Sequence, residues 1–222
     1  MRNSILSIFS LTTFSLIACA APSNTDNSAG TTTAMMAPAP SEQDHTGQSK
    51  AYFGAGCFWV MEAMFEDLKG VSNVVSGYSG GTSPDPSYEA VCSGNTGHAE
   101  SVEVYYDPKV ISYATLLKVF FGSQDPTQVN GQGPDHGTQY RSVIFYQNAD
   151  EKAQAEKAIA DLTASGKVDG RVAAQLAPFE KFWKAEDYHQ GYEKLHPDQP
   201  YVASVSKRRY DAFAEKFGEL LK

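Results

Sequence analysis

The sequence predicts an α+β fold for residues 50–222, in which a mixed sheet and a layer of helices form a two-layer sandwich. Short apolar stretches bounded by Gly and Pro, which are typical of strands, are interspersed with segments whose apolar residues recur at helical spacing. The two kinds of segment do not alternate strictly, as they would in a parallel βαβ protein, and this favours a mixed sheet. No internal repeat or second linker divides this part of the chain, so we expect one domain.

The spacing of apolar residues places the elements in order. A strand over residues 51–56 ends in glycines, and a helix over residues 57–68 follows it and stops at Gly70. Asn148 and Glu151 form a helix start that resembles a capping box. The remaining expected strands cover residues 71–78, 98–106, 141–146 and 172–179, the remaining helices cover residues 112–121, 148–164 and 207–221, and residues 125–138 form a long loop.

The first 49 residues do not resemble a folded domain. Residues 1–18 begin with a positive charge and continue in an apolar run that is too short to span a bilayer, as in a secretory signal peptide. Residues 16–19 resemble the bacterial lipobox, after which Cys19 becomes the lipidated first residue; a simple A-x-A cleavage site is the alternative. Residues 19–49 contain no aromatic residue, so we expect a flexible tether with a reach of roughly 30 Å.

The residue after the lipobox cysteine bears on location. Ala20 stands where an aspartate often retains lipoproteins in an inner membrane. We therefore expect the protein to be lipid-anchored through Cys19 in the outer membrane and to face the periplasm, in a bacterium with two membranes.

Composition excludes several classes of function. The formal charge of −8 and the lack of a basic stripe argue against a nucleic-acid partner, and we interpret the run 207–209 as a solvated helix face. His136, His189 and His196 are not spaced as metal ligands with any cysteine or carboxylate, so no metal site is predicted. The pair Gly54 and Gly56 is a weak lead to a dinucleotide site, because Trp59 stands where the third glycine would be. No cofactor is predicted.

Cys57 is the candidate nucleophile. It follows two glycines and opens a predicted helix, where backbone N–H groups and the helix dipole favour a thiolate and are expected to lower its pKa below about 8.5. The glycines would allow a substrate to approach closely. The alternative is a packed core cysteine.

Several motifs in order resemble one enzyme family. They are residues 56–59 (Gly-Cys-Phe-Trp), Tyr88, residues 97–100 (Gly-His-Ala-Glu), residues 133–142 (Gly-Pro-Asp-His-Gly-Thr-Gln-Tyr-Arg-Ser) and residues 185–190 (Ala-Glu-Asp-Tyr-His-Gln). Together they resemble peptide methionine sulfoxide reductases of the A type, over residues 50 to about 201. The resemblance implies a ferredoxin-like core and thiol-dependent reduction of methionine-S-sulfoxide, free and in proteins, which in the cell envelope would repair oxidised proteins.

The resemblance also implies residue roles. Cys57 attacks the sulfoxide sulfur, and Glu100 protonates the oxygen. For that, burial against aromatic residues would have to raise the pKa of Glu100. The other implied roles are hydrogen-bond donation by Tyr88 and Tyr140, support of the site and the peptide by Asp135, and an apolar wall around the S-methyl group made by Phe58 and Trp59. A methyl pocket beside an oxygen site would select one sulfoxide epimer.

Recycling of the nucleophile depends on the remaining cysteines. Many relatives carry a resolving cysteine near the C-terminus, but no cysteine follows Cys92 here. We expect Cys92 to be a buried, inert thiol and the sulfenic acid on Cys57 to be reduced by an external small thiol or a thioredoxin-like partner, in a monomer. Two other classes stay open: a cysteine hydrolase with His98 or His136 as base, and a non-catalytic lipoprotein with a Cys57–Cys92 bridge.

The other polar residues near the motifs have structural interpretations. We expect His98 to be a satisfied structural histidine and Glu103, three positions from Glu100 on a strand, to face the opposite side in solvent. Tyr105 and Tyr106 are expected to pack in the strand, and Tyr188 and His189 to orient the C-terminal segment against the site.

Overall fold

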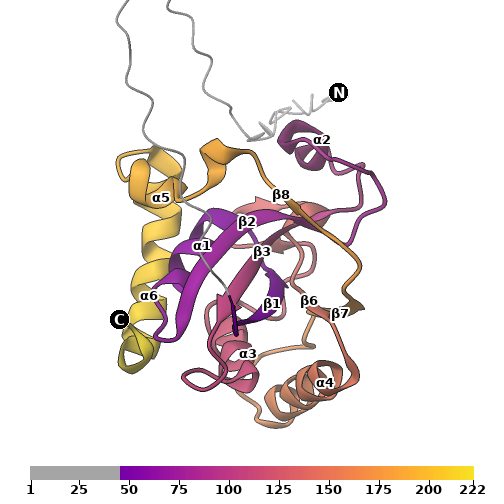
Figure 1. Cartoon of the computed structure of the whole chain (residues 1–222), viewed down its shortest axis with the longest axis vertical. Helices are drawn as coiled ribbons and strands as arrows, with labels where there is room; N and C mark the ends of the chain where they lie inside the picture. Colours follow the sequence, from indigo (N-terminus) through magenta and orange to yellow (C-terminus); the bar gives the residue numbers. More distant parts are fainter. Residues whose placement is uncertain (1–45) are drawn as a thin grey trace, which may run out of the picture. The chain divides into compact units, whose positions relative to one another are not determined.

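The computed structural model describes residues 46–222 and builds them around a six-stranded sheet of order β7-β6-β1-β3-β2-β8 (Figure 1). The strands are β1 (Ser49–Gly54), β2 (Val71–Ser79), β3 (Ala99–Tyr106), β6 (Val143–Tyr146), β7 (Gln175–Pro178) and β8 (Phe182–Lys184). All neighbours are antiparallel except β6 and β7, so the expected mixed sheet is confirmed. The expected signal peptide, Cys19 and nearly all of the tether lie outside the described residues.

The core of the sheet has ferredoxin-like topology. The chain runs β1, α1 (Phe58–Glu66), β2, β3, α3 (Tyr113–Gly122), β6, and β3 inserts between β1 and β2, antiparallel to both. This is the split βαβ arrangement, and it confirms the fold that the resemblance implied. Because β1 and β3 are neighbours, the residue after β1 and the first residues of β3 lie at the same end of the sheet.

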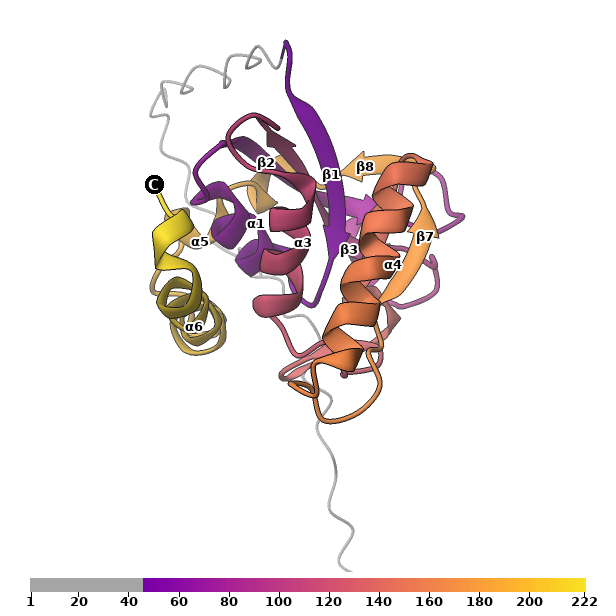
Figure 2. The ribbon, with the colours of Figure 1, turned by 90° about the horizontal axis from the view of Figure 1, so that it is seen from below.

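Helices cover one face of the sheet. Figure 2 shows α1 and α3 on one side of β1, and α6 (Lys207–Phe217) packs on the outside of both. Val102 and Val104 of β3 point into the core between the sheet and these helices. The helix α4 (Ala149–Ala164) packs against α3, β6 and β7. Its start confirms the expected cap, since the Asn148 side chain accepts from the Glu151 backbone N–H over 2.9 Å.

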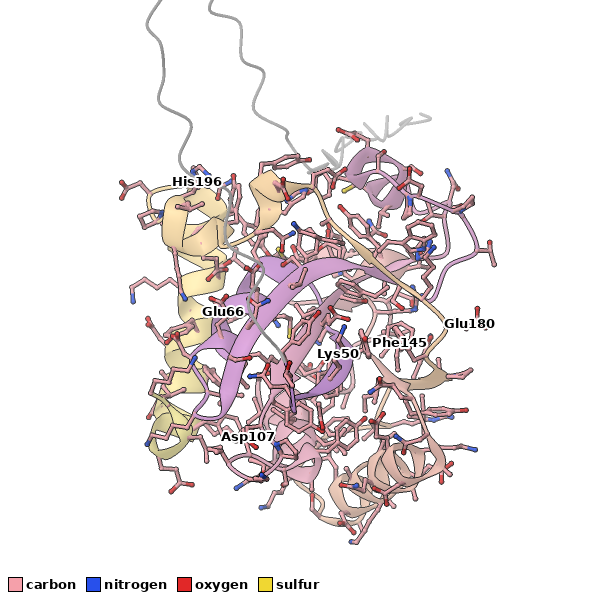
Figure 3. All side chains as sticks on the ribbon, viewed as in Figure 1. Lys50, Glu66, Asp107, Phe145, Glu180 and His196 are labelled. Carbon is pink, nitrogen blue, oxygen red and sulfur yellow. The ribbon has the colours of Figure 1, made fainter. Side chains whose placement is uncertain are left out.

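The opposite face carries a smaller cluster that includes Phe145 and Tyr52, and Lys50 lies beside it (Figure 3). Glu103 belongs to this face, as its spacing from Glu100 predicted, but the expectation that it is solvated is wrong. It is 8% exposed and accepts hydrogen bonds from the Tyr52 and Tyr105 hydroxyls over 2.6 Å each and from Lys50 over 3.1 Å. Strand periodicity predicts the face of the sheet but not what covers that face.

The short elements were not predicted. They are α2 (Tyr88–Cys92), β4 (Gly131–Gln132), β5 (Asp135–His136), β8, α5 (Tyr192–Leu195), the 3₁₀ turns Thr138–Tyr140, Asp187–His189 and Gly218–Leu220, and a π turn at Val202–Ser206. The last of the expected helices ends at Phe217, four residues early. Segments this short have no periodicity of their own, and tertiary contacts decide them. Within residues 46–222, no helix has both the length and the apolar character needed to cross a bilayer.

Candidate active site

Cys57 lies where β1 gives way to α1. It is the N-cap residue of α1, as the sequence predicted, and Ala55 and Gly56 join it to β1. Gly56 has φ +68°, and a Cβ there would come within 2.6 Å of the Gln132 Cβ and 3.0 Å of the Arg209 Nη1. Its N–H donates to the Tyr140 carbonyl over 3.1 Å. Only glycine fits this crowded left-handed position, which holds the loop that carries the thiol.

Glu100 approaches the same helix start from β3. Its side chain is 1% exposed, and Oε2 accepts the backbone N–H of Phe58 over 3.0 Å. The hydrogen bond uses one of the amides that a helix N-terminus leaves without an intrahelical partner. The structure thus places a buried carboxyl at the residue that follows Cys57.

The expectation that the helix start lowers the pKa of Cys57 is wrong. Cys57 is 6% exposed, and burial raises its pKa well above 9.0, as do the charges of Glu100 and Asp135. The Trp59 backbone N–H, which hydrogen-bonds the sulfur, and the Arg209 guanidinium act in the opposite direction. Desolvation outweighs the helix start, so the resting side chain is a thiol at neutral pH.

An aromatic cluster lines the site beside Cys57. Phe58 is 1% exposed, with its ring centroid 6.4 Å from Tyr88 and 5.0 Å from His189. Trp59 is half-buried and stacks on Tyr192 at 3.8 Å between centroids. The structure therefore brings the two expected wall residues and Tyr88 into one apolar neighbourhood.

His189 holds the indole in place. Trp59 Nε1–H donates to His189 Nδ1 over 3.0 Å, so the proton of the neutral ring is on Nε2. Burial lowers the pKa of His189 to about 4, which keeps the ring neutral. Tyr188, by contrast, is 54% exposed. Of the two residues expected to orient this segment, only His189 is in position to fix a wall residue.

Two carboxylates, half-buried Glu186 and buried Glu62, tie the C-terminal segment to α1, β2 and α2. Glu186 accepts from the Tyr88 backbone N–H over 2.8 Å and from the Tyr78 hydroxyl over 2.9 Å. Glu62 on α1 accepts from the Gly191 N–H over 2.6 Å and from the Ser76 hydroxyl, and burial raises its pKa to about 7. These hydrogen bonds hold the C-terminal segment in place, so that His189 lies beside the Trp59 indole although the two residues are far apart in the sequence.

Asp135 reaches the site from the long loop. It accepts from the Tyr201 hydroxyl over 2.6 Å, and the backbone N–H of Cys57 also hydrogen-bonds to it, while burial raises its pKa. The Tyr201 ring meets Trp59 edge-on, with centroids 6.2 Å apart. Sequence reasoning missed Tyr201, because nothing in its neighbourhood in the sequence links it to Cys57.

The basic run on α6 is not uniformly solvated. Lys207 and Arg208 are exposed, but Arg209 turns inward and donates from Nη2 to the Ala55 carbonyl over 3.3 Å. The interpretation of the run as a solvated face is therefore wrong for its third member. A cleft of about 440 Å³ opens beside Arg209 and is also lined by Gln132 and Phe213.

The remaining candidate residues, His98 and Cys92, have no evident part in the site. His98 is 2% exposed, accepts from the Gly81 N–H over 3.1 Å and contacts the Ser83 carbonyl over 2.8 Å, which confirms a satisfied structural histidine and leaves neither ring nitrogen for a hydrolase base. Cys92 closes α2 and is half-buried, so the expectation that it is buried is wrong. No disulfide joins the two cysteines that the structure describes. Within residues 46–222, no group of three or more His, Cys, Asp and Glu side chains is placed to hold a metal ion.

Known proteins resemble this chain in sequence and in fold. The family model "Peptide methionine sulfoxide reductase" matches residues 49–221. A relative from Polynucleobacter asymbioticus, "Peptide methionine sulfoxide reductase MsrA", is 47% identical over 173 residues, which cover 78% of this chain and 90% of the relative.

Two solved structures agree with these matches. Reduced Mxr1 from Saccharomyces cerevisiae is 34% identical with a TM-score of 0.64, covering 69% of this chain and 88% of its own. Methionine sulfoxide reductase A of Corynebacterium diphtheriae is 35% identical with a TM-score of 0.62, covering 68% and 76%. The resemblance seen in the motifs is confirmed, and this chain belongs to the peptide methionine sulfoxide reductase family.

Proposed function

We propose that this protein reduces methionine-S-sulfoxide, free and in proteins, to methionine, with Cys57 as nucleophile and Glu100 as acid. The observation that carries the proposal is the placement of the Glu100 carboxyl at the Phe58 amide, directly after Cys57, beside an aromatic wall. A sulfoxide oxygen leaves sulfur only when it is protonated, so a nucleophile and an acid must meet at one substrate.

The chemistry is a two-electron oxygen transfer. The Cys57 sulfur attacks the sulfoxide sulfur, Glu100 delivers a proton to the oxygen, and the oxygen passes to Cys57 as a sulfenic acid while methionine leaves. One external thiol then displaces water from the sulfenic acid to form a mixed disulfide, and a second thiol restores Cys57 and leaves as the external disulfide. A thioredoxin-like protein or a small thiol supplies both reducing equivalents.

The surrounding residues receive matching roles. Phe58 and Trp59 enclose the S-methyl group, while the Tyr88 and Tyr140 hydroxyls donate to the oxygen, and Asp135 supports the loop through the Cys57 amide. Holding the methyl group and the oxygen on separate sides of Cys57 admits one epimer at sulfur.

We further propose that the enzyme is a lipoprotein. Cys19 carries the lipid, residues 19–49 form the tether, and a periplasm-facing domain repairs oxidised envelope proteins from the outer membrane. The support is the lipobox-like end of the signal peptide and the absence of Asp at position 20.

The test supplies the full-length protein with dithiothreitol and either the S or the R epimer of a methyl sulfoxide substrate, and follows methionine release. We expect turnover of the S epimer only, loss of turnover in Cys57→Ser, and retention in the matched Cys92→Ser variant. Equal rates on the two epimers would contradict the proposed specificity, and turnover near wild type by Cys57→Ser would contradict the proposed mechanism.

A further inference from the structure

The chain preceding α6 changes helical register beside the active site. Tyr201 has helical backbone, Val202–Ser206 form a π turn, and α6 continues from Lys207. In a regular α-helix, residues eight apart such as Tyr201 and Arg209 point about 80° apart, whereas residues seven apart are separated by only about 20°. A π turn accommodates one extra residue, so it brings Tyr201 and Arg209 onto one face of the helix.

That shared face is turned towards the nucleophile loop. Arg209 Nη2 donates to the Ala55 carbonyl, two residues before Cys57. Arg209 Nη1 lies 3.0 Å from the position that a Gly56 Cβ would occupy. It is buried, and among residues 46–222 it has no hydrogen-bond partner. The Arg209 guanidinium thus supports the Ala55–Cys57 loop through Nη2, while its Nη1 is a buried donor next to that loop.

The groups around Cys57 disfavour its thiolate form. Glu100 from β3 and Asp135 from β5 both oppose its ionisation, and Tyr201 faces it from the turn before α6. Tyr140 adjoins the loop through its carbonyl bond to Gly56. A thiolate formed in this buried, acidic setting needs a nearby positive charge, and desolvated pairs of opposite charge interact strongly.

Arg209 supplies this positive charge. Its guanidinium lowers the pKa of Cys57 and of Asp135, against the larger effect of burial on each. We propose that Arg209 is a positioning residue for the nucleophile, which holds the Ala55–Cys57 loop and stabilises the Cys57 thiolate as it forms. The inference rests on the proposed role of Cys57 and adds to it a cation supplied by the C-terminal helix.

The test measures ionisation of Cys57 directly. The full-length protein is alkylated with iodoacetamide from pH 6.5 to pH 10.5, and the modified Cys57 peptide is quantified by mass spectrometry. The variants are Arg209→Met, which removes the charge at similar length, Arg209→Lys, which keeps it, and Arg208→Met as the matched exposed control on the same helix. Thermal unfolding verifies that each variant is folded.

We expect Arg209→Met to shift the alkylation profile to higher pH and to lower the rate at pH 7 about 10-fold, since one pKa unit changes the thiolate fraction tenfold. Arg209→Lys, which keeps the positive charge, and Arg208→Met should stay within about 3-fold of wild type. Loss of the charge should be rescued by Arg209→Lys, whereas loss from a displaced loop would appear in Arg209→Lys as well, because lysine lacks the planar guanidinium.

A wild-type alkylation rate in Arg209→Met at every pH, or a deficit as large in Arg209→Lys as in Arg209→Met, would overturn the proposal. Alkylation is independent of turnover, so these outcomes are separate from failure of the proposed function, which would appear as turnover by Cys57→Ser or no reduction by wild type.

Discussion

The backbone N–H of Phe58 donates to Oε2 of Glu100 over 3.0 Å, which joins the first residue of α1 to the neighbouring strand β3. The bond is buried and spans 42 residues of sequence. It places a carboxyl next to the wall residue and the thiol at once. The Cys57 thiol, the Glu100 carboxyl and the Phe58 ring therefore lie together at the helix start.

Replacement of Glu100 tests its proposed role as the acid. Glu100→Gln keeps an acceptor for the Phe58 amide but cannot deliver the same proton, so the single-turnover rate of methionine formation should fall by about 10²-fold or more. Glu103→Gln is the matched control, since it lies on the same strand and is also buried but faces the other side. It should change stability rather than rate. An unchanged single-turnover rate in Glu100→Gln would mean that another group supplies the proton.

Two buried groups should make opposite contributions to acid stability. The pKa of His189 is lowered from 6.5 to about 4, so the unfolded chain binds a proton first and stability is lost as the pH falls from 6.5 towards 4. The pKa of Glu62 is raised from 4.5 to about 7, so its contribution is present below pH 4.5 and is lost as the pH rises through 7. Each of the two pKa shifts corresponds to roughly 3 kcal/mol in the free energy of unfolding.

Denaturant unfolding at several pH values separates the two. Relative to wild type, the unfolding free energy of Glu62→Gln should fall by roughly 3 kcal/mol between pH 7.5 and 4.5, and that of His189→Gln should rise by a similar amount between pH 6.5 and 4. Differences of the same sign in both variants would show that the two groups do not titrate as the structure implies.

The recycling route can be read from a thiol count. In a Cys19→Ser variant treated with substrate and no reductant, then denatured, the number of titratable thiols should fall from two to one, because only Cys57 is oxidised. A fall to none would identify Cys92 as a resolving cysteine. Bridging would require the two Cα atoms to come within about 7 Å.

The anchor is tested at the mature N-terminus. Mass spectrometry of the protein from a native membrane fraction should find Cys19 as the first residue and lipid attached to it. An unmodified mature N-terminus in that fraction would rule the anchor out, and a variant with Cys19→Ser should leave the membrane fraction while keeping its reductase activity.

Local patterns were sufficient for part of this protein. Helical spacing after two glycines located Cys57 at the start of α1, the capping pair located the start of α4, and the ordered motifs identified the family. These features depend on neighbours within a few residues, or on sequence identity alone, and both can be read along the chain.

The tertiary structure decided the electrostatics of the site. Burial, with Glu100 and Asp135, reversed the expected direction of the Cys57 pKa, and partners from other strands enclosed Glu103. Arg209, which follows a π turn, donates to the Ala55 carbonyl in the loop that carries Cys57. Periodicity determines which face a side chain occupies, but solvation and charge depend on what packs against that face, and here those groups come from segments far apart in the sequence.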